Sequence, residues 1–226
     1  MKVSEIFYSL QGEGFLAGIP SMFVRLAGCP LRCRWCDTKY AWDEKSGTDY
    51  SINEIVETVN RADSRFVVIT GGEPMTNSDL PELVQKLKAS DRHITIETVG
   101  IAFIPDLACD LMSISPKLSN STPYDPKLAA NHENSRLDIA VLRKLVDNYK
   151  YQLKFVVDSQ DDLAEIQRTI EKLGNVDSEK VMLMPQAATR DELLAKSPIV
   201  AEMCKRTGFT FCQRLQLLLW NNKRGT

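Results

Sequence analysis

The stretch CPLRCRWC, residues 29–36, places three of the six cysteines of the chain within eight residues. It follows the apolar segment FVRLAG, residues 23–28, which has the pattern of a strand. Thiolates this close together can hold a metal centre, because they wrap one face of it. The other three cysteines, Cys109, Cys204 and Cys212, stand singly in apolar surroundings, which is typical of cysteines that pack as small hydrophobic side chains.

The composition is that of an ordinary globular protein. The chain has 226 residues, of which 43% are hydrophobic and 26% charged, and this is enough for one domain with a sizeable core, expected to span residues 1–226. The formal charge is −2 and the only basic stretch is the final NNKRGT, so direct nucleic-acid binding has little electrostatic support. Neither a signal peptide nor a membrane span is evident, so a cytoplasmic location with reduced cysteines is expected.

Strand-like and helix-like segments alternate along the chain, and this predicts a mostly parallel sheet with helices outside it, because parallel strands need crossovers. With about six such strands we expect an open partial (β/α) barrel of one α/β domain. An N-terminal strand and loop are expected to bind substrate and a C-terminal strand to close the domain. The expected strands are 2–10, 21–28, 65–70, 93–98, 110–115, 151–157, 180–185 and 209–220; the expected helices are 51–62, 78–90, 137–149, 161–174 and 189–208, the last broken near Pro198, with an irregular loop at 116–134.

Three more motifs stand directly after predicted strands: TGGEP ends at Pro74, SPK spans 115–117, and PQ spans 185–186. In barrels of parallel strands the carboxyl ends of the strands meet at one face, where the chemistry gathers. The cysteine stretch also follows a strand, so the four motifs are expected to share one site. Taken singly, a glycine-rich turn or a strand-end hydroxyl is more commonly structural.

Three interpretations compete for the clustered cysteines. Structural zinc usually takes four ligands from two separated pairs, whereas this chain has one group of three, and neither His93 nor His132 stands as an evident fourth ligand. A disulfide is disfavoured in a reducing compartment. An iron–sulfur cluster fits better, since thiolates are its usual ligands and three of them leave one iron of a four-iron cluster open.

The spacing Cys-x-x-x-Cys-x-aromatic-Cys, filled by Cys29, Cys33, Trp35 and Cys36, resembles the signature of the radical S-adenosylmethionine superfamily. The resemblance implies that the three cysteines hold a 4Fe-4S cluster, that S-adenosylmethionine chelates the open iron, and that Trp35 lies near the adenine. It also implies that one-electron reduction cleaves this cofactor to a 5′-deoxyadenosyl radical, which abstracts hydrogen from the substrate. A fourth cysteine would block the cofactor.

The TGGEP segment matches the GGE motif of the same superfamily and follows the cysteines by one predicted β-α-β unit. From the residues alone, its glycines let a ligand approach the backbone and leave N–H and C=O groups free. The resemblance implies that the segment grips the amino group of S-adenosylmethionine. The expected cofactor-binding residues are Trp35, Gly71, Gly72, Glu73, Ser115, Pro116, Lys117 and Gln186.

Three further stretches narrow the resemblance to one family: YSLQGEG at 8–14, FVRLAGCPLRCRWCDT at 23–38 and LWNNKRG at 219–225. With TGGEP and SPK they resemble the 7-carboxy-7-deazaguanine synthase family, from Ser9 to the carboxyl end. The resemblance implies a lyase whose substrate, 6-carboxy-5,6,7,8-tetrahydropterin, contracts with loss of ammonia to 7-carboxy-7-deazaguanine in queuosine and 7-deazapurine biosynthesis. It also implies that S-adenosylmethionine is regenerated.

A pterin is planar and carries donors and acceptors along one edge, which the QGEG segment can match with side-chain and backbone groups. The Arg25 guanidinium offers a two-pronged contact to the substrate carboxylate. Two plainer interpretations stay open: QGEG as an ordinary turn, and Arg25 in a surface ion pair. Glu97, near the end of a predicted strand, is an equal candidate for the site and for a structural role. The expected substrate contacts are Leu10, Gln11, Gly12, Glu13, Arg25 and Thr70.

A second metal is implied by the CDT motif. In the family that the chain resembles, the residue matching Thr38 binds Mg²⁺ together with substrate oxygens and water, and Mg²⁺ accepts such a small number of protein ligands. The ion would hold the substrate carboxylate and stabilise charge during the rearrangement. A helix cap formed by Asp37 or Thr38 is the competing interpretation.

The chain departs from the family pattern near its end. Many members carry a histidine in the segment matching RLQLLLWNNKRG, where this chain has Gln216 and no histidine. Glutamine can replace the hydrogen bond of a histidine but not its proton chemistry. The effect of Gln216 on activity or on the exact substrate is therefore open.

Two rival functions remain. A glycyl-radical-enzyme activase, or another small radical enzyme, would keep the cysteine and GGEP motifs but has no need for QGEG with Arg25. A zinc-stabilised binding protein without catalysis would be colourless, whereas a cluster protein is brown. The expected partners are a small-molecule pterin, a flavodoxin or ferredoxin as the low-potential electron donor, and a second copy of the chain in a homodimer. Which donor serves, and whether the product enters tRNA or a secondary metabolite, stays open.

Overall fold

A computed structural model describes residues 1–221 and 223–226 of the protein, so Asn222 of the LWNNKRG motif lies outside the described residues. Within these residues one sheet of nine strands has the order β3-β1-β2-β4-β5-β6-β7-β8-β9. The strands are β1 (Lys2–Leu10), β2 (Pro20–Leu26), β3 (Thr48–Asp49), β4 (Phe66–Gly71), β5 (His93–Thr98), β6 (Leu111–Ile114), β7 (Tyr151–Val157), β8 (Val181–Pro185) and β9 (Thr210–Phe211).

With the exception of β3, the strands from β2 to β9 pair in parallel with one another. Strand β1 instead pairs antiparallel with β2 on one side and with β3 on the other. Because the order begins at β3 and ends at β9, the sheet is not closed. The predicted α/β fold with an open partial barrel is therefore confirmed.

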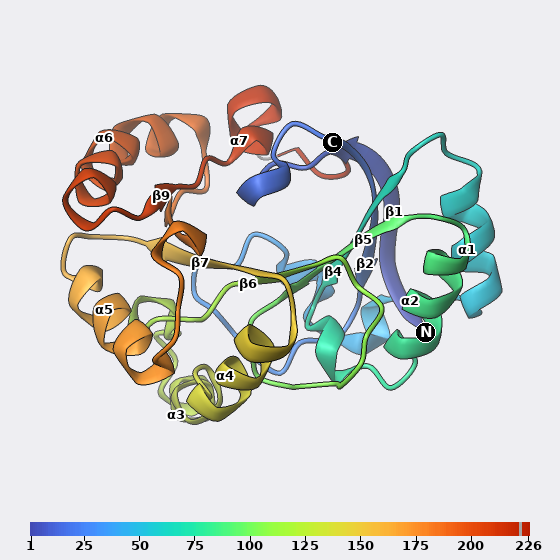
Figure 1. Ribbon diagram of the computed structural model, residues 1–226, viewed down its shortest axis with the longest axis horizontal. Coiled ribbons are helices and arrows are strands. Elements are labelled where there is room, and N and C mark those ends of the chain that lie inside the picture. Colours follow the sequence, from blue (N-terminus) through green and yellow to red (C-terminus); the bar gives the residue numbers. More distant parts are fainter. Residues whose placement is uncertain (222) are drawn as a thin grey trace.

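The helices surround the outer side of the curved sheet, as Figure 1 shows. Helix α1 begins at the capping box formed by Ser51 and Glu54, in which each residue bonds the backbone N–H of the other. No helix in the described part of the chain combines the length and the apolar character that crossing a membrane requires. The helices are α1 (Ile52–Asn60), α2 (Leu80–Ala89), α3 (Pro126–Ser135), α4 (Ile139–Asn148), α5 (Asp162–Leu173), α6 (Arg190–Thr207) and α7 (Leu215–Trp220).

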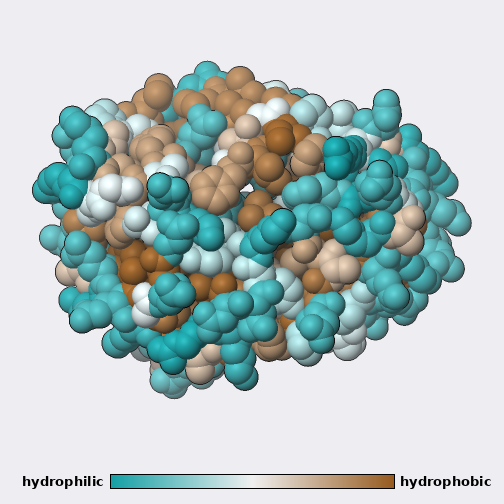
Figure 2. Space-filling model, in the orientation of Figure 1, coloured by the Kyte–Doolittle hydropathy of each residue, from teal (hydrophilic) through white to brown (hydrophobic). Residues whose placement is uncertain are grey.

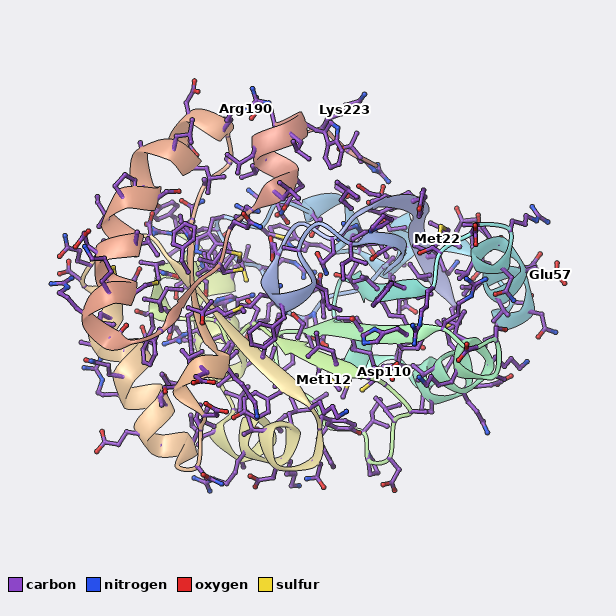
Figure 3. The ribbon with its side chains drawn as sticks, turned by 45° about the horizontal axis from the view of Figure 1, so that its top comes forward. Met22, Glu57, Asp110, Met112, Arg190 and Lys223 are labelled. Carbon is purple, nitrogen blue, oxygen red and sulfur yellow. The ribbon has the colours of Figure 1, made fainter. Side chains whose placement is uncertain are left out.

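The main core lies between the sheet and this layer of helices. Ile55 of α1 and Leu83 of α2 are fully buried, and they belong to the same core cluster as Ile69 and Met112 of the strands. In Figure 3 Glu57 of α1 points outward at the edge of the molecule, whereas Met112 lies among the strands. The outer helices thus bury their apolar faces on the sheet and leave the other face of the sheet to the interior of the barrel.

The predicted irregular loop at 116–134 is wrong in its second half, because α3 begins at Pro126. The side chain of Asp125 accepts a hydrogen bond of 2.8 Å from the Lys127 N–H, and Pro126 occupies the first turn, which are both helix-start signals. The helix buries one side chain, that of His132, so its sequence carries almost no apolar periodicity. The missing periodicity explains why the helix was not predicted.

The predicted break near Pro198 is also wrong, since α6 continues through this residue. Pro198 has no N–H to donate to the preceding turn. Buried side chains on both sides of the proline, including Leu193 and Val200, hold the helix in place. The Ser197 hydroxyl also bonds the carbonyl of Leu193 at 2.6 Å, within the same turn.

The predicted closing strand at 209–220 is largely wrong. Only Thr210 and Phe211 form a strand, and Leu215–Trp220 form the helix α7. A short apolar run such as LQLLLW suits either a strand or a helix, so its neighbours decide. Here the Leu215 N–H bonds the carbonyl of Gly12 at 2.9 Å, and Leu217 packs against Ala187 and Leu193. The chain therefore crosses the open side of the barrel as a helix, next to the N-terminal loop (Figure 1).

Candidate active site

One cavity of about 780 Å³ lies at the carboxyl ends of the parallel strands. It gathers residues from the N-terminal loop, the cysteine loop, the carboxyl ends of strands β4 to β8 and the C-terminal segment. Of the residues predicted for the site, Glu73 and Pro116 are buried outside its lining. The predicted residues that line it are Leu10, Gln11, Gly12, Glu13, Arg25, Cys29, Cys33, Trp35, Cys36, Thr38, Thr70, Gly71, Gly72, Ser115, Lys117 and Gln186.

The cysteine loop after β2 is fixed by backbone hydrogen bonds to a neighbouring turn and within the loop itself. Its first part bonds the turn that follows it, with the N–H of Gly28 on the carbonyl of Ala41 at 2.9 Å and that of Cys29 on Trp42 at 3.1 Å. Its last part closes on itself, since the Cys36 N–H bonds the carbonyl of Cys33 at 3.1 Å. All three thiols consequently line the same cavity.

The thiols are poor acids as they stand. Burial raises the pKa of Cys29 to about 12 and that of Cys33 to about 11, and repulsion from the charge on a neighbouring cysteine adds to both. Iron would supply the opposing positive charge and favour the thiolates, as bound metals do. Among the described residues, no group of three or more His, Cys, Asp or Glu side chains is placed to hold a single metal ion. A 4Fe-4S cluster needs a different arrangement, because each thiolate binds a separate iron and the three surround a volume.

The glycines of TGGEP are required by the cysteine loop. A Cβ on Gly72 would stand 1.8 Å from the carbonyl oxygen of Gly28, and one on Gly71, whose φ is 130°, 2.2 Å from that of Leu26. The N–H of Gly72 bonds the Leu26 carbonyl at 2.9 Å, and that of Glu73 bonds Gly28 at 2.8 Å. The expectation that these N–H groups stay free for a ligand is therefore wrong for Gly72 and Glu73: they fasten the turn to the cysteine loop.

The Glu73 carboxylate holds the TGGEP turn from the side away from the cavity lining. It accepts hydrogen bonds from the Thr98 hydroxyl at 2.7 Å, the Val99 N–H at 2.7 Å and the Met75 N–H at 2.9 Å. The side chain is 2% exposed, and burial raises its pKa. In this structure Glu73 thus ties β4 to β5 under the cavity.

A second group of predicted cofactor residues meets around Trp35. The Lys117 ammonium lies 5.4 Å from the centre of the Trp35 ring and donates to the Ser115 hydroxyl at 2.8 Å. The Trp35 indole N–H bonds the carbonyl of Asn120 at 3.1 Å, which fixes the ring. At the end of β8, the Gln186 amide oxygen accepts a bond of 2.9 Å from Lys196 of α6. These contacts leave an aromatic face beside polar groups, a suitable surface for a nucleoside.

Part of the cavity wall is a buried charge network centred on Lys154 of β7, which is 3% exposed. Its ammonium donates to Glu13 at 2.9 Å and lies 3.5 Å from Glu97. Glu97 also accepts from the Gln11 amide at 3.1 Å and from the Thr70 hydroxyl at 2.9 Å. Glu97 therefore belongs to the candidate site. Gln11 and Glu13 of the QGEG segment do not only form a turn, because their side chains bind Glu97 and Lys154 in the cavity wall.

Glu13 connects this network to the C-terminal segment. Gln216 donates its amide N–H to Glu13 at 2.8 Å, and Arg214 donates its Nε at 3.3 Å. Burial raises the pKa of Glu13, but the charges of Lys154 and Arg214 outweigh it and bring the pKa to about 2. Arg214 also binds Asp37, next to the last cysteine, at 2.6 Å. Glu13 is thus an anion at neutral pH that joins the N-terminal loop to β7 and to the C-terminal segment.

Arg25 forms the ion pair that the sequence left open, but the pair lies in the cavity wall. Its Nε donates to Glu5 at 2.7 Å, and both side chains are less than 20% exposed, at 16% and 13%. The Tyr40 hydroxyl donates to the same carboxylate at 2.7 Å, and Arg224 binds it from the C-terminal segment at 3.0 Å. Because the pair uses Nε, the terminal nitrogens of Arg25 are the ones suited to an incoming carboxylate.

Thr38 and Gln216 are the two remaining predicted positions of interest. Thr38 precedes the short 3-10 helix Lys39–Ala41, yet among the described residues its hydroxyl forms no capping bond and lies 3.5 Å from the Cys36 sulfur. Asp37 pairs with Arg214 instead of capping. The Gln216 amide oxygen is buried with no hydrogen-bond partner among the described residues. Both residues line the cavity, but the buried Gln216 oxygen is packed against Gly12, where an added Cβ would stand 1.9 Å from it.

Sequence reasoning missed Lys154, Arg214 and Glu5. Lys154 carried a usable signal, because a lysine inside YQLKFVV is a charged residue in an otherwise apolar central strand. Arg214 and Glu5 carried none, since each lies in a segment where a charged residue is ordinary. Their roles depend on tertiary contacts, such as those of Arg214 with Glu13 and of Arg224 with Glu5, which join the two ends of the chain.

Known proteins resemble this chain over nearly its whole length. Residues 24–120 match the Radical SAM superfamily. The chain is 40% identical to the 7-carboxy-7-deazaguanine synthase of Rhodopirellula baltica over 99% of its own length and 88% of that protein. It is also 40% identical to the 7-carboxy-7-deazaguanine synthase of Halobacterium salinarum, over 98% and 91% of the two chains. Among solved structures, QueE from Escherichia coli has a TM-score of 0.70 at 25% identity, covering 93% of this chain and 92% of that one.

The packing of the GGEP turn against the cysteine loop predicts that Gly72→Ala disrupts the loop. The added Cβ has no room beside the Gly28 carbonyl, and φ is not positive at Gly72, so the effect is steric. We expect iron bound after anaerobic reconstitution to fall at least about ten-fold, the scale typical of lost support around metal ligands. Gly18→Ala is the control. At Gly18 φ is 90°, so alanine adds backbone strain, but no heavy atom lies within 4 Å of the added Cβ, and the iron content should stay near that of the unsubstituted protein. Equal iron contents in the two variants would contradict the packing argument.

The charge network predicts an acid-dependent stability. The pKa of Glu13 falls from 4.5 to about 2 in the folded protein, so its stabilising contribution is full above pH 4.5 and is lost as the pH falls towards 2. By this linkage the contribution is about 3 kcal/mol. Urea unfolding of Glu13→Gln should therefore show a lower free energy of unfolding at pH 7, with a difference from the unsubstituted protein that shrinks below pH 4.5. The exposed Glu57→Gln is the control, and a Glu13→Gln difference that stays constant to pH 3 would count against the network.

Proposed function

The chain belongs to the 7-carboxy-7-deazaguanine synthase family, and we infer from this that it is a radical S-adenosylmethionine lyase acting on 6-carboxy-5,6,7,8-tetrahydropterin. The reaction contracts the pterin ring, releases ammonia and yields 7-carboxy-7-deazaguanine for queuosine and 7-deazapurine biosynthesis. One observation carries this function: a single cavity gathers the cysteine loop, the GGEP turn and the QGEG segment, which are distant in the sequence. Residues 1–226 are proposed to act as one core domain.

The family implies a 4Fe-4S cluster and S-adenosylmethionine as cofactors. Cys29, Cys33 and Cys36 are proposed to hold the cluster, which with S-adenosylmethionine supplies the radical that takes a hydrogen atom from the substrate. Trp35 offers its face to the adenine, while the backbone of Gly71 and Gly72 shapes the wall of the same pocket. Further contacts to the cofactor are proposed for Ser115, Lys117 and Gln186, and Glu73 and Pro116 are proposed to support its pocket from behind the cavity lining.

The substrate is proposed to lie between the charge network and the cysteines. Arg25 binds the substrate carboxylate through its terminal nitrogens. Gln11 and Glu13 supply acceptors for the N–H donors along the pterin edge, and the Gln216 amide N–H holds Glu13 in place. Leu10 and Gly12 add backbone groups, and Thr70 adds its hydroxyl. Lys154 lowers the pKa of Glu13 and so keeps this carboxylate ionised, ready to accept hydrogen bonds in the cavity.

Magnesium is proposed as a further cofactor, with Thr38 as its protein ligand. Two observations support this proposal: the hydroxyl lines the cavity, and Asp37 is already paired with Arg214. Mg²⁺ usually keeps several waters and takes few protein oxygens, so a hydroxyl with the substrate carboxylate suits it. Its charge would hold that carboxylate near Arg25.

A flavodoxin or ferredoxin is proposed as electron donor, because such a cluster has to be reduced at low potential. A cytoplasmic location is proposed on the ground that the cysteines, all in the described residues, are unpaired. A homodimer is proposed as the assembly. Figure 2 shows apolar side chains gathered over α7 and the neighbouring N-terminal loop, where Phe15 and Leu219 are about half exposed, at 49% and 47%. A second copy would remove this surface from water.

The function is tested with the anaerobically reconstituted, reduced protein, S-adenosylmethionine, Mg²⁺ and 6-carboxytetrahydropterin. We expect 7-carboxy-7-deazaguanine by mass spectrometry, and none from Cys33→Ala, because two thiolates cannot replace three in the cluster. Cleavage of S-adenosylmethionine with the pterin untouched would instead favour the glycyl-radical-enzyme activase or another small radical enzyme. A colourless protein with one zinc would favour the binding protein without catalysis.

The magnesium proposal has its own test. Thr38→Ala should raise the Mg²⁺ concentration needed for half-maximal product formation about ten-fold, since one of the few protein ligands is removed. Thr38→Ser keeps the hydroxyl and should remain within about two-fold of the unsubstituted protein. Product formation that is independent of Mg²⁺ in all three proteins would remove magnesium from the site.

A further inference from the structure

His132 of α3 is buried beside the cysteine loop, where it is 2% exposed. Both of its ring nitrogens lie within hydrogen-bond distance of a partner. The Arg32 backbone N–H donates to Nδ1 at 3.3 Å, and the Ser121 hydroxyl lies 2.8 Å from Nε2. Ser121 ends the short 3-10 helix η5 (Ser119–Ser121). The ring therefore links the cysteine loop, through Arg32, to η5, through Ser121.

The partners fix the tautomer of the ring. A backbone N–H can only donate, so Nδ1 accepts and the neutral ring carries its hydrogen on Nε2. Nε2 then donates to the Ser121 oxygen, and the hydrogen of that hydroxyl goes to the Leu118 carbonyl at 2.6 Å. Burial lowers the pKa of His132, which keeps the ring neutral. Every group in this chain of bonds is thereby satisfied.

The same two segments hold the backbone on either side of Cys33. Arg32, on its amino side, is bound by His132, while the N–H of Arg34, on its carboxyl side, bonds the Ser121 carbonyl at 2.9 Å. Asn120 of η5 also accepts from the Trp35 indole. The second half of the cysteine loop thus lies on a platform made of η5 and His132, whereas its first half is held by Ala41 and Trp42.

We propose that His132 is a positioning residue for the iron–sulfur cluster: it fixes the backbone around Cys33 through Arg32 on one side and Ser121 on the other. It is not a ligand to the metal, because both ring nitrogens are already used. The proposal rests on the proposed function in one respect, namely that the three cysteines hold a cluster. Removing the ring leaves the Arg32 N–H without its acceptor in a buried place and loosens the platform.

The test compares four variants of the full chain, each reconstituted anaerobically with iron and sulfide. His132→Leu removes both contacts, His132→Asn keeps an acceptor near the place of Nδ1, and His132→Gln keeps a polar group near the place of Nε2. His93→Leu is the matched control, since His93 is half-buried at the start of β5, away from the cavity lining. The readouts are iron content, the rate of iron loss to a chelator, the electron paramagnetic resonance spectrum of the reduced cluster, and urea unfolding of the cluster-free protein.

We expect His132→Leu to lose cluster iron about ten-fold to a hundred-fold faster than the unsubstituted protein, with a changed spectrum, as is typical when support around metal ligands is removed. His132→Asn should recover most of the lifetime and the original spectrum, and His93→Leu should match the unsubstituted protein. If His132→Leu does not fold, the cluster lifetimes of His132→Asn and His132→Gln are compared with each other instead. A better lifetime in the Asn variant, at equal stability of the cluster-free proteins, supports the proposal.

Two results overturn the proposal. One is an unchanged lifetime and spectrum in His132→Leu; the other is iron loss in every His132 variant that follows only the stability of the cluster-free protein. If the unsubstituted protein itself takes up no cluster, the proposed function fails instead, and this outcome is read from its own iron content before any variant is compared.

Discussion

The buried contact between Glu13 and Lys154 is the constraint on which the rest of the site depends. An ammonium that is 3% exposed requires a nearby anion, because an unpaired buried charge is costly. Glu13 supplies that anion from the N-terminal loop, and Arg214 and Gln216 then bind the same carboxylate from the C-terminal segment. The open side of the barrel is consequently bridged by the two ends of the chain, which meet on one side chain.

A second constraint acts on the cysteine loop, which has no regular secondary structure around its thiols. It is held by backbone contacts to three neighbours: the GGEP turn, the turn at Ala41 and Trp42, and the platform of η5 and His132. Arg214 links the two constraints, since it binds Glu13 and also Asp37, directly after Cys36. The charge network around Glu13 and the cysteine loop, which line the same cavity, are therefore joined through Arg214.

Much of the fold was predictable from local patterns. The capping box at Ser51, the apolar strands and the period of α5 agree with the structure because each depends on near neighbours in the sequence. The failures have physical causes of their own. Helix α3 buries only His132, α6 passes through Pro198 because packing holds it on both sides, and the apolar run of α7 takes its form from contacts with Gly12 and Leu193.

The sequence by itself determined the chemistry, through three cysteines at a fixed spacing and two glycines before Glu73. It also indicated that these motifs lie at the carboxyl ends of strands. Both could be read from the sequence because spacing and strand pattern are local properties. Only the tertiary structure decided which polar groups share the cavity. Sheet register sets Arg25 beside Thr70 and Glu97 beside Ser113, so a row of polar side chains forms across strands that are far apart in the chain. Register and chain closure depend on long-range pairing, which no local pattern encodes.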